Sequence, residues 1–313
     1  MKAIVTGGAG FVGSHLATRL VKEGWSVTVV DNLSSGHERN VPEGAELLTL
    51  DLGEEAAVAQ LPADGADAVF HLASHVGQEL SFERPFYDLK ANAFGTMVML
   101  DWCLKHEVPR MVFASTMNVY GDPDDRERPV TEEMPVRPPS PYAVGKIASE
   151  HLCNVYEPFG VKTTSLRLFN VYGPRQDMQN MKQGMVSIFM SYVARGEPIL
   201  VRGSKDRFRD FIFVDDVVDA FVRGLDERAA GNVYNVSSGK PTHVWELLRE
   251  IVQAFGHDPD EYPITYGDPT PRDQFGIYGD STALRRDLGW APRVELREGI
   301  VEMANWVQET AEL

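Results

Sequence analysis

Gly7-Gly8-Ala9-Gly10-Phe11-Val12-Gly13 is the stretch of sequence that decides the fold. It follows a short apolar segment, residues 3–6, and opens an amphipathic segment of helix length. In this strand–turn–helix context, glycines permit a tight turn and let backbone amides approach a pyrophosphate, which the helix N-terminus also favours. We therefore predict a dinucleotide-binding turn made by Gly7, Gly10, Phe11, Val12 and Gly13.

Beyond this turn, short Val- and Ile-rich runs alternate with helix-length amphipathic segments through the first half of the chain. This alternation is typical of a parallel sheet with helices on both faces. We predict strands over residues 2–6, 26–30, 46–50, 68–72, 110–115 and 162–168, and helices over 11–23, 85–106 and 142–159. The expected fold class is α/β, with a doubly wound parallel sheet of the Rossmann type.

The second half of the chain has a looser pattern, with Pro- and Gly-rich joints between its segments. Helices are predicted over residues 184–195, 215–226, 243–255 and 296–309, with short strands between them. We expect residues 1–170 to form an NAD-binding domain. Residues 171–313 would form mainly a smaller α/β substrate-binding lobe, with some segments returning to the first domain.

Composition and charge exclude several classes of function. The 313 residues are 43% hydrophobic and 24% charged, with no apolar run near the roughly 20 residues that a membrane span needs. The formal charge of −16 opposes nucleic-acid binding. The N-terminal segment lacks signal-peptide features, so we expect a cytoplasmic protein without a membrane partner. Cys103 and Cys153 are too few for a disulfide framework and lack the spacing of a metal site, so we expect free thiols and no metal.

An acidic residue follows the second predicted strand, eighteen residues beyond Gly13. There the Asp31 carboxylate can accept hydrogen bonds from the adenosine ribose hydroxyls and would repel a 2′-phosphate. Asp31 is followed by Asn32, with no arginine directly beside it. The pattern favours NAD over NADP, although Arg39 lies close enough in the sequence to keep NADP open.

A phenol and an ammonium group share one face of the predicted helix over residues 142–159. Tyr142 and Lys146 are four residues apart, so they are neighbours on a helix. A tyrosine needs such help because its reference pKa of about 10 makes it a poor base at neutral pH. A nearby lysine and a positively charged nicotinamide both favour the phenolate. We predict that Tyr142 and Lys146 are catalytic.

Two hydroxyl groups end the fifth predicted strand, at the carboxyl edge where open α/β sheets bind their ligands. Either Thr116 or Ser115 can hydrogen-bond a reacting substrate hydroxyl. After the fourth strand, His75 and Gln78 could face the same site, although a core or surface role is equally compatible with the sequence.

Taken together, these motifs resemble the extended short-chain dehydrogenase/reductases, specifically the NAD-dependent nucleotide-sugar epimerases and dehydratases that include UDP-glucose 4-epimerases. The resemblance covers nearly the whole chain. It rests on the glycine turn, Asp31-Asn32, Asp51-Leu52, His71-Leu72-Ala73, Asn92, Gly95-Thr96, Ser115-Thr116, Val119-Tyr120-Gly121, Tyr142 with Lys146, the run from Arg167 to Arg175, Arg209-Asp210-Phe211 and Asn235 to Gly239.

This resemblance implies roles for individual residues. Tyr142 and Lys146 would also hold the nicotinamide ribose, and Phe169 would flank the nicotinamide. Thr116, Asn170 and Arg209 would bind a nucleotide-sugar substrate, and Asp273 its nucleoside ribose, although Arg272 stands where the family usually has glycine. The remaining NAD contacts would come from Ser35, Gly36, Asp51, Leu52, Leu72, Ala73, Ser74 and Asn92.

The two positions after Thr116 distinguish reactions within the family. The 4,6-dehydratases resembling this chain carry an Asp-Glu pair there, because loss of water needs a further acid and base. Met117 and Asn118 supply neither. We therefore expect 4-epimerisation of a UDP-hexose through a 4-keto intermediate. The alternatives are a dehydratase, an epimerase acting at another carbon, and a non-catalytic NAD-binding sensor or scaffold.

The resemblance also implies a homodimer, in which the helices over residues 85–106 and 142–159 meet those of a second copy. The sequence offers Phe94, Met97, Met99 and Trp102 for an apolar contact face, but the same residues suit an internal core equally well.

Overall fold

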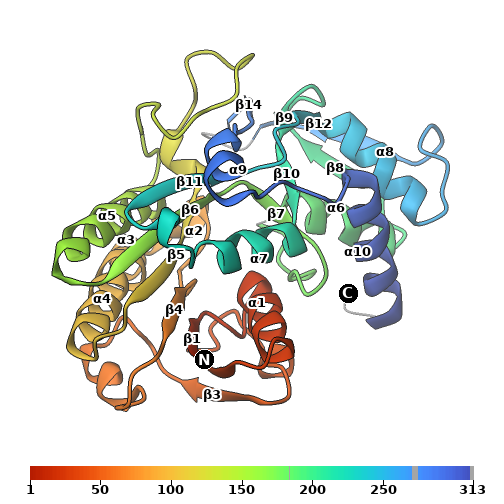
Figure 1. Cartoon of the computed structure of the whole chain (residues 1–313). Coiled ribbons are helices and arrows are strands. Elements are labelled where there is room, and N and C mark those ends of the chain that lie inside the picture. The colour runs from red at the N-terminus through yellow and green to blue at the C-terminus, as the bar shows by residue number, and fades with distance from the viewer. Residues whose placement is uncertain (183, 270–273, 311–313) are drawn as a thin grey trace.

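A seven-stranded parallel sheet forms the centre of the structure, a computed structural model that describes residues 1–182, 184–269 and 274–310 (Figure 1). The strand order is β11-β6-β5-β4-β1-β2-β3, and every neighbouring pair is parallel. This confirms the predicted doubly wound α/β fold. The strands are β1 (Lys2–Thr6), β2 (Ser26–Asp31), β3 (Ala45–Thr49), β4 (Ala68–His71), β5 (Arg110–Thr116), β6 (Lys162–Leu168) and β11 (Asn232–Val236).

Both faces of the sheet are buried, because alternate side chains of each strand enter separate cores. In β1, Ala3 and Val5 pack with Leu16 of the first helix, whereas Ile4 lies in the core that contains Leu100. The helices of one face are α1 (Phe11–Lys22) and α7 (Val214–Arg223), and those of the other are α3 (Pro85–Leu89), α4 (Gly95–Lys105) and α5 (Pro141–Tyr156) (Figure 1).

The predicted helix over residues 85–106 is interrupted. Between α3 and α4 the chain makes a π-helical turn, Lys90–Phe94, which contains Asn92. Single π-helical turns of this kind are frequent at functional sites. Two short helices are not predicted by the sequence pattern: α2 (Gln78–Glu83), which packs against α3 and α5, and α9 (Thr282–Leu288), which packs against β11.

A second set of elements from the C-terminal half has its own apolar core, which includes Phe189, Leu247 and Met303. Its helices are α6 (Met185–Ala194), α8 (Val244–Ala254) and α10 (Leu296–Thr310), beside the strand pair β8 (Ile199–Arg202) and β13 (Ile264–Gly267). Strands between the two cores are β7 (Asn170–Tyr172), β10 (Phe211–Phe213), β9 (Phe208–Arg209), β12 (Thr242–His243) and β14 (Gly276–Ile277).

Short 3-10 turns occupy Glu38–Asn40, Glu55–Gln60, Met117–Tyr120, Glu157–Phe159 and Glu227–Ala229. Among the described residues, no helix combines the length and the apolar composition that crossing a membrane requires. The carboxyl ends of β1, β2, β4 and β5 lie along one edge of the sheet, since these strands are parallel. The predicted site residues therefore have to be sought at that edge.

Candidate active site

The glycine turn between β1 and α1 requires glycine at two positions. Gly7 has a φ of 69°, and a Cβ there would lie 2.7 Å from the backbone nitrogen of Ala73. A Cβ on Gly13 would lie 2.1 Å from the carbonyl oxygen of Gly7. The turn is therefore pressed against both its own helix and the loop after β4. This leaves the start of α1 open to a close backbone approach by a pyrophosphate, so the turn fits a dinucleotide.

The Asp31 carboxylate lies at the end of β2 and organises the turns around it. Its Oδ2 accepts a hydrogen bond from Ala9 N at 3.0 Å, and its Oδ1 accepts one from Leu33 N at 2.8 Å. Gly36 comes so close that a Cβ would lie 3.0 Å from Asp31 Oδ1. The carboxylate thus joins the glycine turn to the loop containing Ser35, at the position that recognises ribose hydroxyls in dinucleotide-binding folds.

Asn32 and Asp51 come together from the ends of two neighbouring strands. Asn32 Nδ2 donates to Asp51 Oδ2 at 3.3 Å, and Asp51 Oδ1 accepts from Gly53 N at 2.9 Å. The adjacent Leu52 is buried. These residues border the cofactor edge on the side of β3, where the resemblance expects the adenine.

A buried hydrogen-bond chain holds the loop after β4. Thr6 Oγ1 accepts from the backbone nitrogens of Leu72 and Ala73, so its own proton goes to His71 Nδ1 at 2.7 Å. His71 Nε2 therefore carries the proton, which it donates to Thr96 Oγ1 at 3.1 Å. Burial lowers the pKa of His71 to about 3, so the ring remains neutral at physiological pH.

Asn92 fixes the next part of the same loop from the π-helical turn. Its Oδ1 accepts from Ser74 Oγ at 2.6 Å, and its Nδ2 donates to the carbonyl oxygen of His75 at 3.1 Å. Gly145 of α5 permits this approach, because a Cβ there would lie only 3.1 Å from the Cβ of Asn92. Leu72, Ala73, Ser74 and Asn92 thus form one continuous wall of the candidate cofactor site.

The Tyr142/Lys146 pair lies on α5, which begins with a capped turn. Ser140 Oγ accepts a hydrogen bond from Ala143 N at 3.3 Å, and Pro141 occupies the first helical position. Both Tyr142 and Lys146 are buried, with 6% and 2% of their surface exposed. Lys146 Nζ donates to the carbonyl oxygen of Ala114 at 2.9 Å. The helix therefore presents both groups to the end of β5.

Burial sets the ionisation of both groups. It raises the pKa of Tyr142 to about 12, an effect partly opposed by the hydrogen bond with Thr116 and increased by the Asp88 carboxylate. Burial also lowers the pKa of Lys146 to about 7, opposed first by Asp88 and then by Glu150. The phenol is therefore protonated at neutral pH unless a further positive charge stabilises its phenolate. A bound oxidised nicotinamide ring is a charge of that kind.

The two hydroxyls at the end of β5 have different surroundings. Thr116 contacts Tyr142 as a hydrogen-bond partner. Ser115, the preceding residue of the strand, points to the opposite side and donates its proton to Glu150 Oε1. The structure thus differs from the expectation for Ser115, because Glu150 engages that hydroxyl inside the core. Of the two, Thr116 is the hydroxyl placed beside the phenol.

The expected substrate residues lie where the two cores meet. Asn170 Nδ2 donates to the carbonyl oxygen of Asp210 at 2.9 Å. Arg209 is buried, and its guanidinium donates to the carbonyl oxygens of Gln274 at 2.7 Å and Phe275 at 3.3 Å. Burial lowers the pKa of Arg209 to about 10, so it still carries a positive charge at neutral pH. Asp273 lies outside the described residues.

A cavity of about 350 Å³ lies beside this arginine. It is lined by Gly203, Ser204, Arg207, Gly267, Pro269 and Phe275. The apolar Pro269 and Phe275, with Arg207 in the lining and Arg209 beside it, suit a planar, negatively charged ligand.

Phe169, expected at the nicotinamide, is buried and packs against Gly279, where a Cβ would lie 2.5 Å from its ring.

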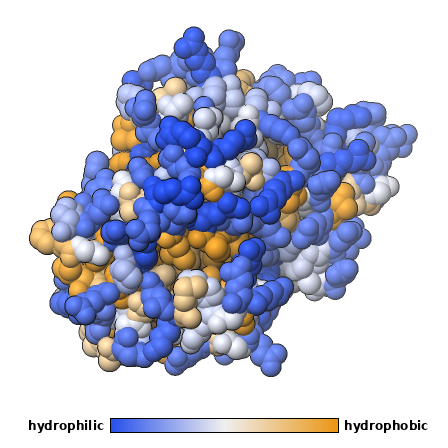
Figure 2. All heavy atoms as spheres, in the orientation of Figure 1, coloured by the Kyte–Doolittle hydropathy of each residue, from blue (hydrophilic) through white to orange (hydrophobic). Residues whose placement is uncertain are grey.

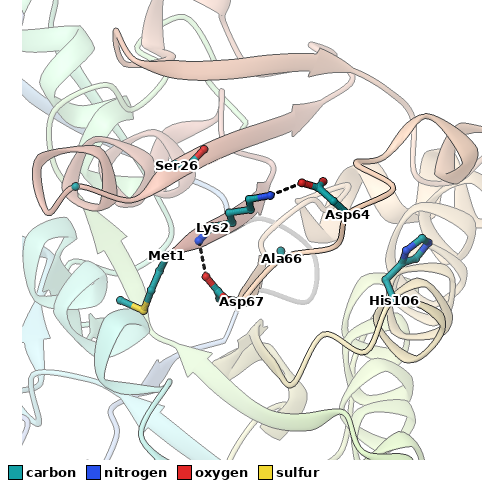
Figure 3. Close-up of a pocket in the computed structure, with 8 residues that line it drawn as sticks. Met1, Lys2, Ser26, Asp64, Ala66, Asp67 and His106 are labelled. Carbon is teal, nitrogen blue, oxygen red and sulfur yellow. Dashed lines mark hydrogen bonds and ion pairs between the residues drawn. The ribbon is translucent and has the colours of Figure 1, made fainter.

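A larger hollow of about 580 Å³ lies at the opposite, amino-terminal edge of the sheet (Figure 3). Lys2 lines it. Its Nζ forms an ion pair with Asp64, and its backbone N–H donates to Asp67 Oδ2 at 2.7 Å. These charged groups satisfy one another, and none of the residues that form the candidate cofactor site lines the hollow. It therefore takes no part in the candidate site.

Two acidic residues near the catalytic pair carry no motif and were not predicted. Asp88 on α3 is completely buried and binds His75, and Glu150 on α5 is buried against Arg167 at 2.7 Å. Spacing gives one usable signal for each: Asp88 is four residues before Asn92, and Glu150 four residues after Lys146. Each therefore lies on the same helical face as a predicted site residue.

Comparison with known proteins gives relatives along the whole chain. The model of the NAD dependent epimerase/dehydratase family matches residues 3–237. UDP-glucose 4-epimerase from Mycolicibacterium smegmatis is 34% identical over 321 residues, covering 100% of both chains. The crystal structure of Thermotoga maritima UDP-glucose 4-epimerase with UDP-glucose has a TM-score of 0.94 at 34% identity, covering 99% of this chain and 100% of its own.

A second solved structure bears on the cofactor. Thermus thermophilus UDP-glucose 4-epimerase in complex with NAD has a TM-score of 0.89 at 33% identity, covering 98% of this chain and 99% of its own. The glycine turn and the Asp31 carboxylate of the present chain fit the same cofactor. On sequence, fold and site geometry, this chain belongs to the NAD dependent epimerase/dehydratase family, and its cofactor is NAD.

Proposed function

We propose that this chain is an NAD-dependent nucleotide-sugar epimerase that inverts C4 of a UDP-hexose. The observation that carries the proposal is the Tyr142–Lys146–Thr116 cluster at the carboxyl edge of a sheet whose first turn fits NAD. The similarity to two solved UDP-glucose 4-epimerases supports the same reaction.

In the proposed reaction, Tyr142 is the acid and base. Its phenolate oxygen accepts the proton of the sugar C4 hydroxyl, while Thr116 donates a hydrogen bond that holds this hydroxyl in line. NAD, which the glycine turn and Asp31 would hold, would supply the hydride acceptor and donor for C4 of the sugar. After the 4-keto sugar has turned over, Tyr142 gives the same proton back, so the site needs no exchange with solvent. Lys146 stabilises the phenolate by its positive charge.

The residues after Thr116 favour epimerisation over dehydration. Met117 is buried, and its sulfur lies 3.7 Å from Asn170 Nδ2. Asn118 bonds through its backbone nitrogen to Thr116 Oγ1 at 3.2 Å. Neither side chain can transfer the additional proton that loss of water requires. One tyrosine suffices for epimerisation, because a single proton leaves and returns.

The nucleotide would bind across the boundary of the two cores. Asn170 and the positively charged Arg209 are proposed to hold the diphosphate, and the cavity beside Phe275 the nucleoside. Asp273 remains a proposed contact to the ribose. Arg207 adds a second positive charge at the cavity wall, which suits a diphosphate.

Product analysis tests this proposal. The purified protein, incubated separately with UDP-glucose, UDP-N-acetylglucosamine and UDP-glucuronate, is expected to produce a C4-inverted sugar from at least one. NMR of the sugar ring protons, without added reductant, detects it. An accumulating keto sugar would favour a dehydratase instead, and no conversion of any tested nucleotide sugar would favour the non-catalytic alternative.

We also propose a homodimer formed through α3, α4 and α5. Several large apolar side chains of these helices are exposed, foremost Phe86, with 89% of its surface accessible. Apolar atoms gather at the left margin of Figure 2, where Figure 1 places these helices. Met99 and Trp102, which the sequence also offered for this face, are buried in the core instead. The exposed members are Phe86, Leu89, Met97, Leu104, Val144 and Val155.

Replacing Phe86 with aspartate is expected to convert a dimer into a monomer, because the charge would be buried at the centre of the contact. Sedimentation velocity of the wild type should give the mass of two chains, and of the variant the mass of one. Tyr266→Asp, at an exposed aromatic residue of β13, serves as the control and should remain dimeric. A monomeric wild type would refute the proposed interface.

A further inference from the structure

Only one of the two carboxylate oxygens of the buried Asp88 has a hydrogen-bond partner among the described residues. Asp88 lies on α3 with its side chain fully inside the protein, and its Oδ2 is 2.9 Å from His75 Nδ1. Its Oδ1 is also buried, and in the part of the chain that the structure describes this oxygen has no hydrogen-bond partner. A buried carboxylate oxygen without a partner is costly, so it calls for a nearby positive charge.

Lys146 is the buried cation that matches this carboxylate. It lies on α5, and α3 packs directly against α5. Asp88 is the anion that most strongly raises the pKa of Lys146 against the effect of burial. The next anion, Glu150, has both of its oxygens on the Arg167 guanidinium, at 2.9 and 2.7 Å. The charge of Glu150 is therefore largely balanced by Arg167, whereas the only described side chain bonded to Asp88 is the imidazole of His75.

We infer that Asp88, held in place by His75, is the counter-charge of Lys146 and keeps its ammonium group charged beside Tyr142. Asp88 is then a positioning residue, because it acts through Lys146 without touching the reacting atoms. The inference rests on the proposed acid–base role of Tyr142 and Lys146. The positive charge of Lys146 and the negative charge of Asp88 then cancel each other. Proton transfer to Tyr142 therefore occurs beside a pair without net charge.

Other groups facing Lys146 do not replace Asp88. His71 from β4 is neutral, since burial lowers its pKa to about 3. The Cys153 thiol of α5 is also neutral, since burial raises its pKa to about 12. In the absence of NAD the phenol of Tyr142 is protonated and uncharged, since burial raises its pKa to about 12, and Ala114 offers only a carbonyl oxygen. From α3 and the loop after β4, the groups near Lys146 are Asp88 itself and its partner His75.

The direct test is an NMR titration of Lys146 in the protein loaded with NAD. Lysine labelled with ¹³C at Cε reports the protonation of each ammonium, and the Lys146 signal is assigned from its absence in a Lys146→Met sample. Asp88→Asn keeps the shape of the side chain and removes its charge. We expect the Lys146 pKa to fall by about one unit or more, the usual effect of losing an adjacent opposite charge.

Two further variants separate charge from packing. Asp88→Ser also removes the charge but has a different shape. Both Asp88 variants should therefore lower the Lys146 pKa by the same amount. If only one of them folds, that variant alone is a sufficient test. Asp101→Asn removes an exposed carboxylate paired with Lys105 on α4 and should leave Lys146 unchanged. A Lys146 pKa unchanged within about 0.3 units in a folded Asp88 variant would overturn the inference.

The pH profile of turnover provides a second readout. The loss of activity as the pH rises through the Lys146 pKa should move to lower pH by the same amount in Asp88→Asn, and kcat should change more than KM. An alkaline limb that does not move overturns the link to catalysis. Because the titration needs no turnover, a Lys146 shift in a chain that epimerises nothing would refute only the proposed function.

Discussion

Tyr142→Phe is expected to lower kcat by about 10²–10⁴-fold while the protein remains folded and keeps its cofactor. The change removes one oxygen atom from a buried side chain and leaves the ring packing intact. Without the phenol, no group beside Thr116 can take the sugar proton, because Lys146 is held on the Ala114 carbonyl oxygen. The effect should appear in kcat much more than in KM, since the proton moves only in the transition state.

The measurement is steady-state conversion of the best nucleotide sugar, combined with calorimetric titration of NAD into the variant. Tyr156→Phe, near the end of the same helix and outside the site, is the matched control and should keep wild-type turnover. If Tyr142→Phe kept more than a tenth of the wild-type kcat, Tyr142 would lose its acid–base role. Loss of NAD binding in the variant would instead indicate that the phenol mainly holds the cofactor.

The central sheet could be predicted because most of its strands are largely buried on both faces, the edge strand β3 being the exception. Strands of this kind appear as short, largely apolar runs, as in β1 and β2, and the first six strands were predicted to within one residue at each end. β11 was not predicted as the seventh strand. Its sequence Asn-Val-Tyr-Asn-Val mixes polar and apolar residues, and its place beside β6 depends on a pairing between segments more than 60 residues apart.

Some residues of the candidate site could likewise be predicted from local sequence patterns, and others could not. Gly7, Asp31, Tyr142 and Lys146 could be proposed because their chemistry depends on spacing within one turn or one helix. Asp88 could not, because its importance comes from burial against α5, more than 50 residues later in the chain. Local patterns likewise predict one continuous helix where the chain makes a π-helical turn around Asn92. Such contacts follow from tertiary packing, which local patterns do not encode.

Glu150→Gln is expected to destabilise the protein by about 3–5 kcal/mol, the usual cost of removing one partner of a buried ion pair. The Arg167 and Glu150 side chains are only 7% and 4% exposed. Arg167 also donates to Tyr120 Oη at 3.0 Å, so the guanidinium is fixed in the core and cannot turn to solvent. Losing the carboxylate charge therefore leaves a buried positive charge between α5 and β6.

Chemical denaturation and the thermal midpoint measure this loss. Asp101→Asn, which breaks an exposed pair between neighbouring turns of α4, should cost no more than about 0.5 kcal/mol. A loss for Glu150→Gln as small as that of the control would contradict the expectation. Turnover at a temperature where the variant is folded should also fall, because Glu150 anchors the helix that carries Tyr142 and Lys146.

A double-mutant cycle separates the ion pair from the rest of the network. Arg167→Met removes the charge but keeps an apolar chain, and Glu150→Gln with Arg167→Met leaves no buried charge at this place. If the cost of Glu150→Gln comes from the unpaired guanidinium, the double variant should be more stable than Glu150→Gln alone. Equal stability of the two would instead attribute the cost to the weakened hydrogen bond from Ser115, the only other described side chain bonded to Glu150, because a glutamine oxygen accepts it without a charge.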